Sequence, residues 1–298
     1  MKSILNIFLG LSLSAMAILQ SCGSDDSEED ISGQLAIDNI EINTYIAVNA
    51  LQNVQTSETS LRYIITEVGT GEDILVQDIV SVHYEGRYLD GRAFDSSYDR
   101  GEPLTYNFGI GAVVPGFDEG VLRIGDGGKG TIIVPSYLAY GASGYGDIAP
   151  NEILVFDMEV LSDAQILETE NEAIDEYISE NSLTGLSTTQ TGLRYIITTP
   201  GEGDNAMAGN TVECRYEGRF LDGNIFDNNG GVVLIYNVGD TEVISGWNEG
   251  VSLLNKGAKA TFILPSSLAY GRLGNSRGSV PIPANTVVLF DIEIIDIR

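Results

Sequence analysis

The sequence predicts an α+β protein with two similar domains, each an antiparallel sheet that wraps around one short helix. Three observations lead to this prediction. The chain repeats itself, since YEGR begins at Tyr84 and again at Tyr216, 132 positions later, and LRYIIT recurs with the same offset. Most of each repeat is rich in Val, Ile, Tyr and Phe that alternate with polar residues or run together, which is typical of strands. Only one stretch inside each repeat has apolar residues at helical spacing.

Each repeat opens with a predicted helix. Apolar residues at i, i+3 and i+4 predict a short amphipathic helix before the first strand. The repeated positions are Ile42, Tyr45, Ile46 and Asn49 in the first copy and Ile174, Tyr177, Ile178 and Asn181 in the second. The second helix runs through ILETENEAIDEYISEN (166–181) and doubles as the linker between the domains. We expect each helix to pack on its own domain; a dimerisation helix is the alternative.

Strands follow each helix. In the first copy they are predicted over LRYIIT, DIVSVHYEGRYL, LTYNFG, KGTIIVP and EILVFDMEVL. LDG (89–91) indicates a hairpin turn. Before KGTIIVP, the apolar residues of FDEGVLRIGDGG (117–128) have helical spacing, and glycines end this helix. One helix among about five strands makes an α+β domain.

The N-terminus resembles the signal of a bacterial lipoprotein. Lys2 precedes an apolar run, ILNIFLGLSLSAMAIL, which is typical of a secretory signal. LQSC (19–22) resembles a lipobox, in which Cys22 becomes the acylated first residue; an incidental cysteine is the alternative. SDDSEED (24–30) cannot form a core and is expected to be a solvated tether. The predicted organisation is a signal peptide at 1–21, an acidic tether at 22–35, a first domain with its preceding helix at 36–163, a linker helix at 164–185 and a second domain at 186–298.

Charge and residue content exclude several functions. The formal net charge of −28 would repel a polyanion, so nucleic acid is not an expected partner. The only histidine, His83, lies in a predicted strand, and we expect it to be structural. Cys214, the only cysteine besides Cys22, lies in an alternating apolar stretch and is expected to be a buried structural thiol. GDGGKG (125–130) lacks the spacing of a phosphate-binding loop and is expected to be a turn. We therefore expect no metal, no cofactor and no nucleophilic triad.

The remaining candidates are aromatic and aliphatic residues beside turns. The first copy has VHYEGRYLDGRAFDSSYDRGEPLTYNFGIGAVVPGFDEGV, PSYLAYG and LVFDMEVL; the second has RYEGRFLDGNIFDNN, VISGWNEGV, PSSLAYG and VVLFDIEI. These segments resemble the FKBP family of peptidyl-prolyl isomerases. The patterns Y-x-G-x-x-x-D-G-x-x-F-D, V-[IV]-x-G-[WF]-x-E-G and LAYG occur in this order in both copies. The resemblance implies two FKBP-like domains, each with a twisted antiparallel sheet around one short helix.

The resemblance also implies a proline-binding pocket in each domain, with Phe117 and Trp247 as the floors. The implied walls are Tyr84, Phe94, Tyr106, Val113, Val114, Ile148 and Phe156 in the first copy, and Tyr216, Phe226, Tyr236, Val243, Ile244, Ile282 and Phe290 in the second. The implied catalytic residues are the carboxylates Asp95 and Asp227 and the hydroxyl donors Tyr140 and Tyr270. The backbone N–H of Val114 or Ile244 would hold a second substrate carbonyl. Leu104 and Leu234 stand where many members have another aromatic residue.

Two departures from the family pattern concern the pocket. Phe117 replaces the usual tryptophan of the floor. The rim loops also differ between the copies, since NNGGVV is two residues shorter than SSYDRGEP and GRLGNSRGSVPIPAN is longer than GASGYGDIAPN. Both loop changes lie at the rim, so they bear on substrate preference more than on the fold.

The resemblance implies an FKBP-type peptidyl-prolyl cis-trans isomerase that assists the folding of exported proteins and needs no cofactor. The expected partners are unfolded or extended proline-containing polypeptides, macrolide inhibitors of the tacrolimus type, and a membrane reached through lipid on Cys22. The expected location is the bacterial envelope, at the outer membrane, on its periplasmic or surface face. A non-catalytic chaperone or scaffold module that binds proline-containing segments is the main alternative. A surface adhesin or motility accessory is a third hypothesis, suggested by the tether alone.

Overall fold

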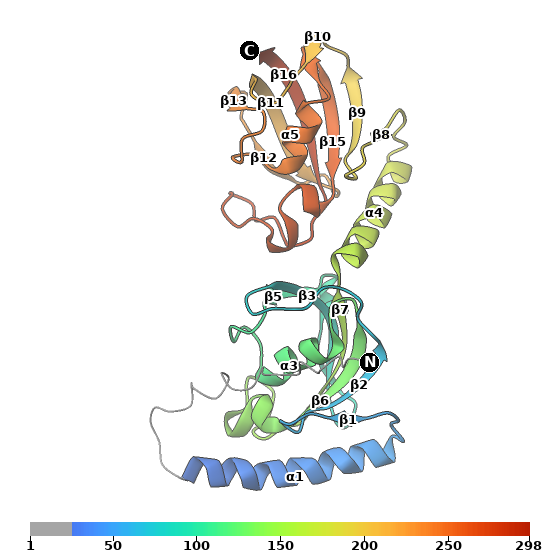
Figure 1. The fold of residues 1–298 in the computed structure, drawn as a ribbon, viewed down its shortest axis with the longest axis vertical. Helices are drawn as coiled ribbons and strands as arrows, with labels where there is room; N and C mark the ends of the chain where they lie inside the picture. The colour runs from blue at the N-terminus through green and yellow to red at the C-terminus, as the bar shows by residue number, and fades with distance from the viewer. Residues whose placement is uncertain (1–25) are drawn as a thin grey trace, which may run out of the picture.

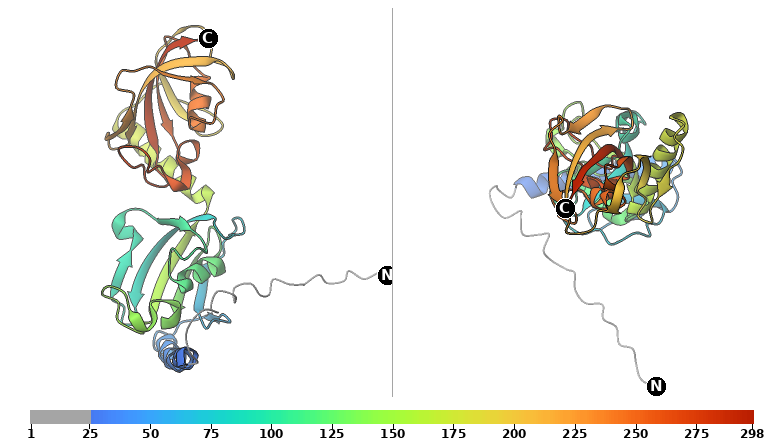
Figure 2. Two further views of the ribbon diagram at one scale, coloured as in Figure 1. Left: turned by 90° about the vertical axis from the view of Figure 1, so that its left-hand side faces the viewer. Right: turned by 90° about the horizontal axis from the view of Figure 1, so that it is seen from above.

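The computed structural model describes residues 26–298, which form two domains placed end to end (Figure 1). Helix α4 (Asp163–Glu180) leads from the first domain to the second. Helix α1 (Asp26–Val48) crosses the end of the first domain that lies away from the second (Figure 2). The signal peptide, Cys22 and the first residues of the predicted tether lie outside the described residues.

The first domain is one antiparallel sheet with a helix against it. Its elements are β1 (Gln55–Thr56), β2 (Arg62–Glu67), β3 (Ile79–Tyr88), β4 (Ala93–Ser96), α2 (Ser97–Arg100), β5 (Leu104–Asn107), α3 (Pro115–Ile124), β6 (Lys129–Val134), two 3₁₀ turns η1 (Ser136–Leu138) and η2 (Gly141–Ser143), and β7 (Leu154–Leu161). The sheet order is β1-β2-β6-β7-β3-β4, and β5 pairs with β3. All five predicted strands are present, so these predictions are confirmed.

The second domain repeats this plan. Its elements are β8 (Ser187–Thr188), β9 (Arg194–Thr199), β10 (Glu202–Asn205), β11 (Thr211–Phe220), β12 (Ile225–Asn228), β13 (Leu234–Asn237), α5 (Ser245–Val251), β14 (Asn255–Lys256), β15 (Lys259–Leu264), η3 (Ser266–Leu268), η4 (Gly271–Leu273) and β16 (Val288–Ile297). The sheet order is β12-β11-β16-β15-β9-β8, with β13 paired to β11 and a separate β10-β14 pair. The predicted α+β fold class is confirmed in both halves.

Each core lies between the sheet and its helix. Helix α3 starts at Pro115, whose fixed φ suits a first helical position, and buries Phe117, Val121 and Ile124. Along β7 the burial alternates after the first residues, so one face of the strand packs toward the helix. The helix therefore places Phe117 in the core, against residues of the central strands, which is where the predicted pocket floor is needed.

The outer helices pack on the opposite side of their own sheets. In the first domain Ile42 of α1 packs with Ile133 and Val155. In the second domain Ile174 of α4 packs with Ile263 and Leu289. The prediction that each helix packs on its own domain is confirmed.

Helix α1 is longer than the short helix predicted from the sequence. It begins at Asp26, inside the stretch 22–35 that we expected to be a tether. The helix therefore takes in most of the stretch that we expected to be a tether.

A buried carboxylate on each outer helix binds the 3₁₀ turn that follows β6 or β15. Asp38 accepts hydrogen bonds from the N–H and the Oγ of Ser136, at 2.8 and 2.7 Å. Glu170, its counterpart 132 positions later, accepts from the N–H of Ser266 at 2.9 Å. Both acids are buried, and neither was among the residues predicted from the sequence. The signal that could have found them is the repeat itself, which places an acid at the same position of both helices.

Cys214 is fully buried in β11, and burial raises the pKa of its thiol to about 12. The prediction of a buried structural thiol is confirmed. In a Cys22→Ser chain, in which Cys214 is the only cysteine, we expect no reaction with a thiol reagent at pH 8 until the domain unfolds, because the thiolate is the reactive form. Absorbance of the released chromophore, with and without denaturant, measures this. Rapid labelling of the folded chain would contradict the expectation.

None of the helices within residues 26–298 is both long and apolar enough to cross a membrane. The same residues contain no group of three or more His, Cys, Asp or Glu side chains placed to hold a metal ion.

Candidate functional site

Four aromatic rings from four elements meet at the centre of the first domain. The Phe117 ring of α3 lies 5.3 Å from the ring of Tyr84 on β3 and 5.3 Å from that of Phe156 on β7, both edge to face. The Phe94 ring of β4 lies 5.7 Å from that of Phe156, again edge to face. Edge-to-face contacts place the positive edge of one ring on the negative face of another. Phe117 is buried, so its ring forms the base of this cluster.

The glycine of the repeated YEGR phrase makes this ring arrangement possible. A Cβ atom on Gly86 would lie 2.6 Å from Cζ of Phe94 and 3.1 Å from Cε1 of Phe156. In the second domain a Cβ on Gly218 would lie 2.7 Å from Cε1 of Phe290. Any side chain at these two positions would therefore push the rings away from the strand.

The second domain builds the same cluster with a tryptophan at its base. The Trp247 ring of α5 lies 4.8 Å from that of Tyr216 and 5.2 Å from that of Phe290, both edge to face. Phe226 on β12 contacts Phe290 at 5.5 Å. Trp247 is 3% exposed, and its Nε1 has no hydrogen-bond partner among the described residues. The Trp for Phe exchange therefore keeps an aromatic base in both domains.

All of the apolar residues predicted for the two pockets join these clusters. The buried members are Tyr84, Tyr106, Phe117 and Phe156 in the first domain, and Phe226, Tyr236, Trp247, Ile282 and Phe290 in the second. The partly exposed members are Phe94, Val113, Val114, Tyr140 and Ile148, and Tyr216, Val243, Ile244 and Tyr270. Leu104 and Leu234 pack against the same clusters. The structure thus brings together a buried aromatic base and a half-exposed apolar rim in each domain.

The predicted carboxylates lie at one side of each cluster. Asp95 accepts a hydrogen bond from Tyr84 Oη and forms an ion pair with Arg100, and Arg100 Nη2 also donates to Tyr84 Oη at 3.1 Å. Burial, followed by the hydrogen bond to Asp95, raises the pKa of Tyr84 to about 12. In the second domain Asp227 accepts from Tyr216 Oη at 2.8 Å. Each carboxylate therefore holds the wall tyrosine of its own domain.

Arg100 was not identified from the sequence. It lies on α2, the short helix of the longer loop SSYDRGEP, and its guanidinium lies 5.5 Å from the centre of the Tyr84 ring. The shorter loop NNGGVV of the second domain contains no arginine. The difference in loop length between the two copies was the signal that could have found it. Within residues 26–298, Asp95 forms an ion pair with an arginine and Asp227 forms none.

The predicted hydroxyl donors lie within electrostatic range of the carboxylates. Burial raises the pKa of Tyr140, and the charges of Tyr145 and then Asp95 add to this effect. Burial also raises the pKa of Tyr270, and Asp227 adds to it. Neither hydroxyl has a hydrogen-bond partner in the part of the chain that the structure describes. The Tyr140 ring stacks on Tyr145 at 5.1 Å. Both hydroxyls are therefore free to donate to a bound molecule.

The start of each core helix supplies a backbone donor. Val114 and Ile244 precede the first residues of α3 and α5 in extended conformation, and neither helix has a side-chain cap. Their carbonyl groups accept from within the helix, whereas their N–H groups donate to no backbone group in residues 26–298. The first N–H groups of a helix have no partner inside it, so these donors are available.

The sequence around both ring clusters matches a known protein family. The family model described as FKBP-type peptidyl-prolyl cis-trans isomerase matches residues 71–161 and again residues 203–295. The chain belongs to this family. Each match contains one complete ring cluster with its carboxylate and its tyrosine, so both halves are FKBP domains.

Individual relatives agree with this assignment over parts of their length. FKBP9 of Mus musculus, named as a peptidyl-prolyl cis-trans isomerase, is 34% identical over 229 residues, which are 75% of this chain and 35% of that protein. FkpA of Escherichia coli, an FKBP-type isomerase, is 46% identical over 110 residues, 37% of this chain and 40% of the other. The chain thus spans about a third of the length of the FKBP9 relatives. The crystal structure of FkpA from Escherichia coli is 39% identical, with a TM-score of 0.39 over 46% of this chain and 62% of that one.

The two FKBP domains differ in one buried hydroxyl. Tyr106 Oη donates to Asp118 Oδ1 at 3.0 Å, and burial raises the pKa of both groups. Its counterpart Tyr236 is 5% exposed, and its hydroxyl has no partner among the described residues. Asn248, which stands in the place of Asp118, donates to the carbonyl of Asp240 instead.

We expect opposite effects when these tyrosines are replaced by phenylalanine. Tyr106→Phe removes a buried hydrogen bond and should lower the free energy of unfolding of the first FKBP domain by about 1–2 kcal/mol. Tyr236→Phe removes a buried hydroxyl without a partner and should leave the second domain unchanged or more stable by up to about 1 kcal/mol. Urea unfolding of the two variants measures the difference. Equal destabilisation would contradict it.

Proposed function

We propose that this protein is a peptidyl-prolyl cis-trans isomerase that assists the folding of exported proteins and is held at the bacterial envelope by lipid on Cys22. The observation that carries the activity is an arrangement found in both domains. A buried aromatic base lies beneath a half-exposed apolar rim, with a carboxylate at one side and a partnerless tyrosine hydroxyl within its electrostatic range.

The reaction needs no nucleophile, because isomerisation is a rotation about the X–Pro amide bond. The barrier to this rotation is about 18–20 kcal/mol, and unaided isomerisation takes tens of seconds or longer. A tenfold acceleration corresponds to about 1.4 kcal/mol of selective transition-state stabilisation. The twisted amide has less charge separation than the planar one, so an apolar site that excludes water favours the twisted form.

The residues of each domain suit these requirements. The prolyl ring would rest on Phe117 or Trp247, whose faces are large and apolar. The Tyr140 or Tyr270 hydroxyl would donate to one substrate carbonyl, and the N–H of Val114 or Ile244 to another. The proposed substrates are unfolded or extended proline-containing polypeptides, and macrolides of the tacrolimus type are the proposed inhibitors.

An isomerase assay on the full chain tests this proposal. We expect acceleration of the cis-to-trans conversion of a proline-containing tetrapeptide, followed by a conformation-specific protease, and inhibition by a macrolide of the tacrolimus type. The fluorescence of Trp247, the only tryptophan, reports at the same time whether the second domain is folded. A folded chain that accelerates nothing would overturn the proposal.

The location is proposed from residues 1–30. The apolar run before Cys22, the lipobox-like LQSC and the acidic stretch after it support an exported lipoprotein at the outer membrane. We expect labelling by radioactive palmitate in growing cells, and loss of both label and membrane association in Cys22→Ser. External protease added to intact cells distinguishes the surface face from the periplasmic face. A labelled Cys22→Ser protein would contradict the assignment of the lipid site.

A further inference from the structure

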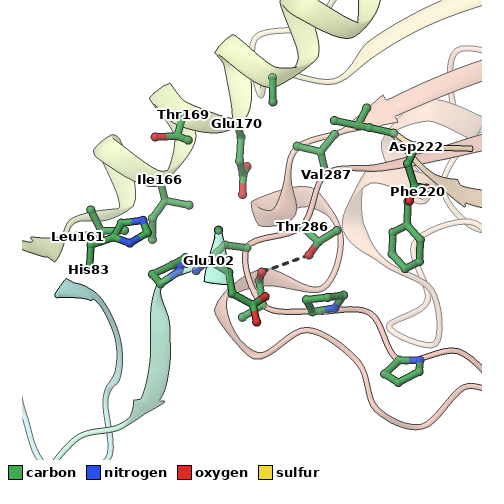
Figure 3. Close-up of a pocket in the computed structure, with 18 of the residues that line it drawn as sticks. His83, Glu102, Leu161, Ile166, Thr169, Glu170, Phe220, Asp222, Thr286 and Val287 are labelled. Carbon is green, nitrogen blue, oxygen red and sulfur yellow. Dashed lines mark hydrogen bonds between the residues drawn. The ribbon is translucent and has the colours of Figure 1, made fainter. Parts of the chain in front are cut away.

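The two domains and helix α4 line an open cavity of about 760 Å³ (Figure 3). None of the four rings at the centre of either domain lines it, although its wall residue Phe220 contacts Phe226 at 5.0 Å. Pro103 of the first domain forms one wall, and Ile166 of α4 forms a second. Phe220 and Pro283 of the second domain form the others. The walls are therefore mainly apolar, and the volume is in the range of sites that bind small molecules or a few residues of a peptide.

Hydrogen bonds between the domains hold this cavity in shape. Arg272 of η4 donates to Asp163 Oδ1 at 2.8 Å and to the carbonyl of Leu161 at 3.1 Å. Asn285 donates to Ser81 Oγ at 3.0 Å. Both donors belong to the long loop GRLGNSRGSVPIPAN, which the sequence predicted to be a pocket rim. Because this loop also carries Pro283, the same contacts set the distance between the cavity walls.

The charge of the cavity lining is one-sided. Glu102, Glu159, Glu170 and Asp222 line it, together with His83, and no lysine lines it. Glu159 forms an ion pair with Lys129 at 3.0 Å. The other three carboxylates form no ion pair within the described residues. A ligand that carries a positive charge is therefore favoured over a neutral or an anionic one.

Glu170 is the carboxylate of the cavity lining most suited to bind a positively charged group. It is 5% exposed, projects from α4 toward the second domain, and uses Oε2 for the N–H of Ser266, whereas Oε1 has no partner among the described residues (Figure 3). Its counterpart Asp38 differs, because it accepts from Gln34 at 2.7 Å as well as from both groups of Ser136. A buried polar atom normally has a hydrogen-bond partner, so the spare oxygen of Glu170 points to a ligand donor.

We infer that this cavity is a second peptide-binding site, which takes an apolar segment that carries one lysine or arginine and pairs its charge with Glu170. A long side chain of this type matches the lining, because its stem is apolar and its charged end reaches a carboxylate. A metal ion does not fit, since the residues described contain no cluster of three ligating side chains. The inference does not depend on the proposed isomerase activity, because neither Phe117 nor Trp247 and neither of the carboxylates Asp95 and Asp227 lines this cavity.

Two labelled peptides without proline test the inference on the full chain. One is a fluorescein-labelled apolar heptapeptide with a central lysine, and the other has norleucine in place of the lysine. Fluorescence anisotropy should show that the lysine peptide binds at least tenfold more tightly. Glu170→Gln should remove this difference, because the glutamine carbonyl still accepts from Ser266 but the charge is gone. Glu176→Gln, an exposed position on the same helix, is the matched control and should leave the difference unchanged.

A second pair of variants tests whether the interdomain contacts shape the site. Arg272→Ala should weaken binding of the lysine peptide, because it releases the loop that carries Pro283. Arg277→Ala, in the same loop, should leave binding unchanged, since the guanidinium of Arg277 forms no hydrogen bond or ion pair with the residues that the structure describes. Circular dichroism checks that all four variants are folded. Equal affinity for the two peptides, or a difference that survives in Glu170→Gln, would overturn the inference.

Discussion

Replacing Phe290 with alanine is expected to lower the unfolding temperature of the second FKBP domain by roughly 15 °C. Phe290 is 2% exposed, and its ring lies 5.2 Å from that of Trp247 and 5.5 Å from that of Phe226. Truncation of a buried phenylalanine removes apolar burial and leaves a cavity, which together lower the free energy of unfolding by about 3–5 kcal/mol. The fluorescence of Trp247 follows this transition directly.

The repeat supplies the control for this experiment. Phe156 occupies the equivalent position in the first FKBP domain, where it contacts Phe117 and Phe94. Phe156→Ala should shift a transition seen by far-ultraviolet circular dichroism and leave the fluorescence transition of Trp247 in place. If Phe290→Ala did not move the fluorescence transition, the ring cluster would not be the structural centre of its domain.

The second large effect is expected on catalysis. In a chain whose first site is disabled by Asp95→Ala and Tyr140→Phe, the further pair Asp227→Ala and Tyr270→Phe should lower kcat/KM about 10- to 100-fold. Tyr270 loses the hydroxyl proposed to orient the substrate carbonyl, and Tyr216 loses the acceptor that holds it. The protease-coupled tetrapeptide assay measures the change.

Binding should survive in this variant, because the aromatic base and the apolar rim stay in place. A titration of Trp247 fluorescence with the same peptide measures binding separately from turnover. Asp204→Ala, an exposed acid of β10, serves as the control. Unchanged turnover after both substitutions would refute the assigned roles. No turnover in either parent or variant, with binding intact, would favour the alternative of a non-catalytic binding module.

The fold was predictable because the same pattern of strands and one helix occurs in both copies of the repeat. Strand alternation around Tyr84 is matched by the alternation around Tyr216, so a chance pattern in one copy would not recur in the other. The ring clusters were predictable for the same reason, since the residues that build them lie in the repeated phrases. The burial of these aromatic residues and the packing of their rings depend on the local order of strands and one helix, which hydrophobic periodicity in the sequence predicts.

The cavity between the domains was not predictable. Arg272 lies more than a hundred positions from Asp163, and nothing in the sequence relates the two residues before the domains are placed. Arg100 was missed for a different reason, because its contact with Asp95 requires the short helix α2 to turn it back. Both residues lie in segments whose length differs between the copies, so the repeat gave no second example to compare.

The position of helix α4 determines how a further repeat could be added to the chain. It is the outer helix of the second domain and also the connection to the first, so the duplicated unit contains its own spacer. A third unit added at the C-terminus would bring its own outer helix, and this helix would space it from its neighbour. Each added unit would then create one more junction between domains and one more ring cluster.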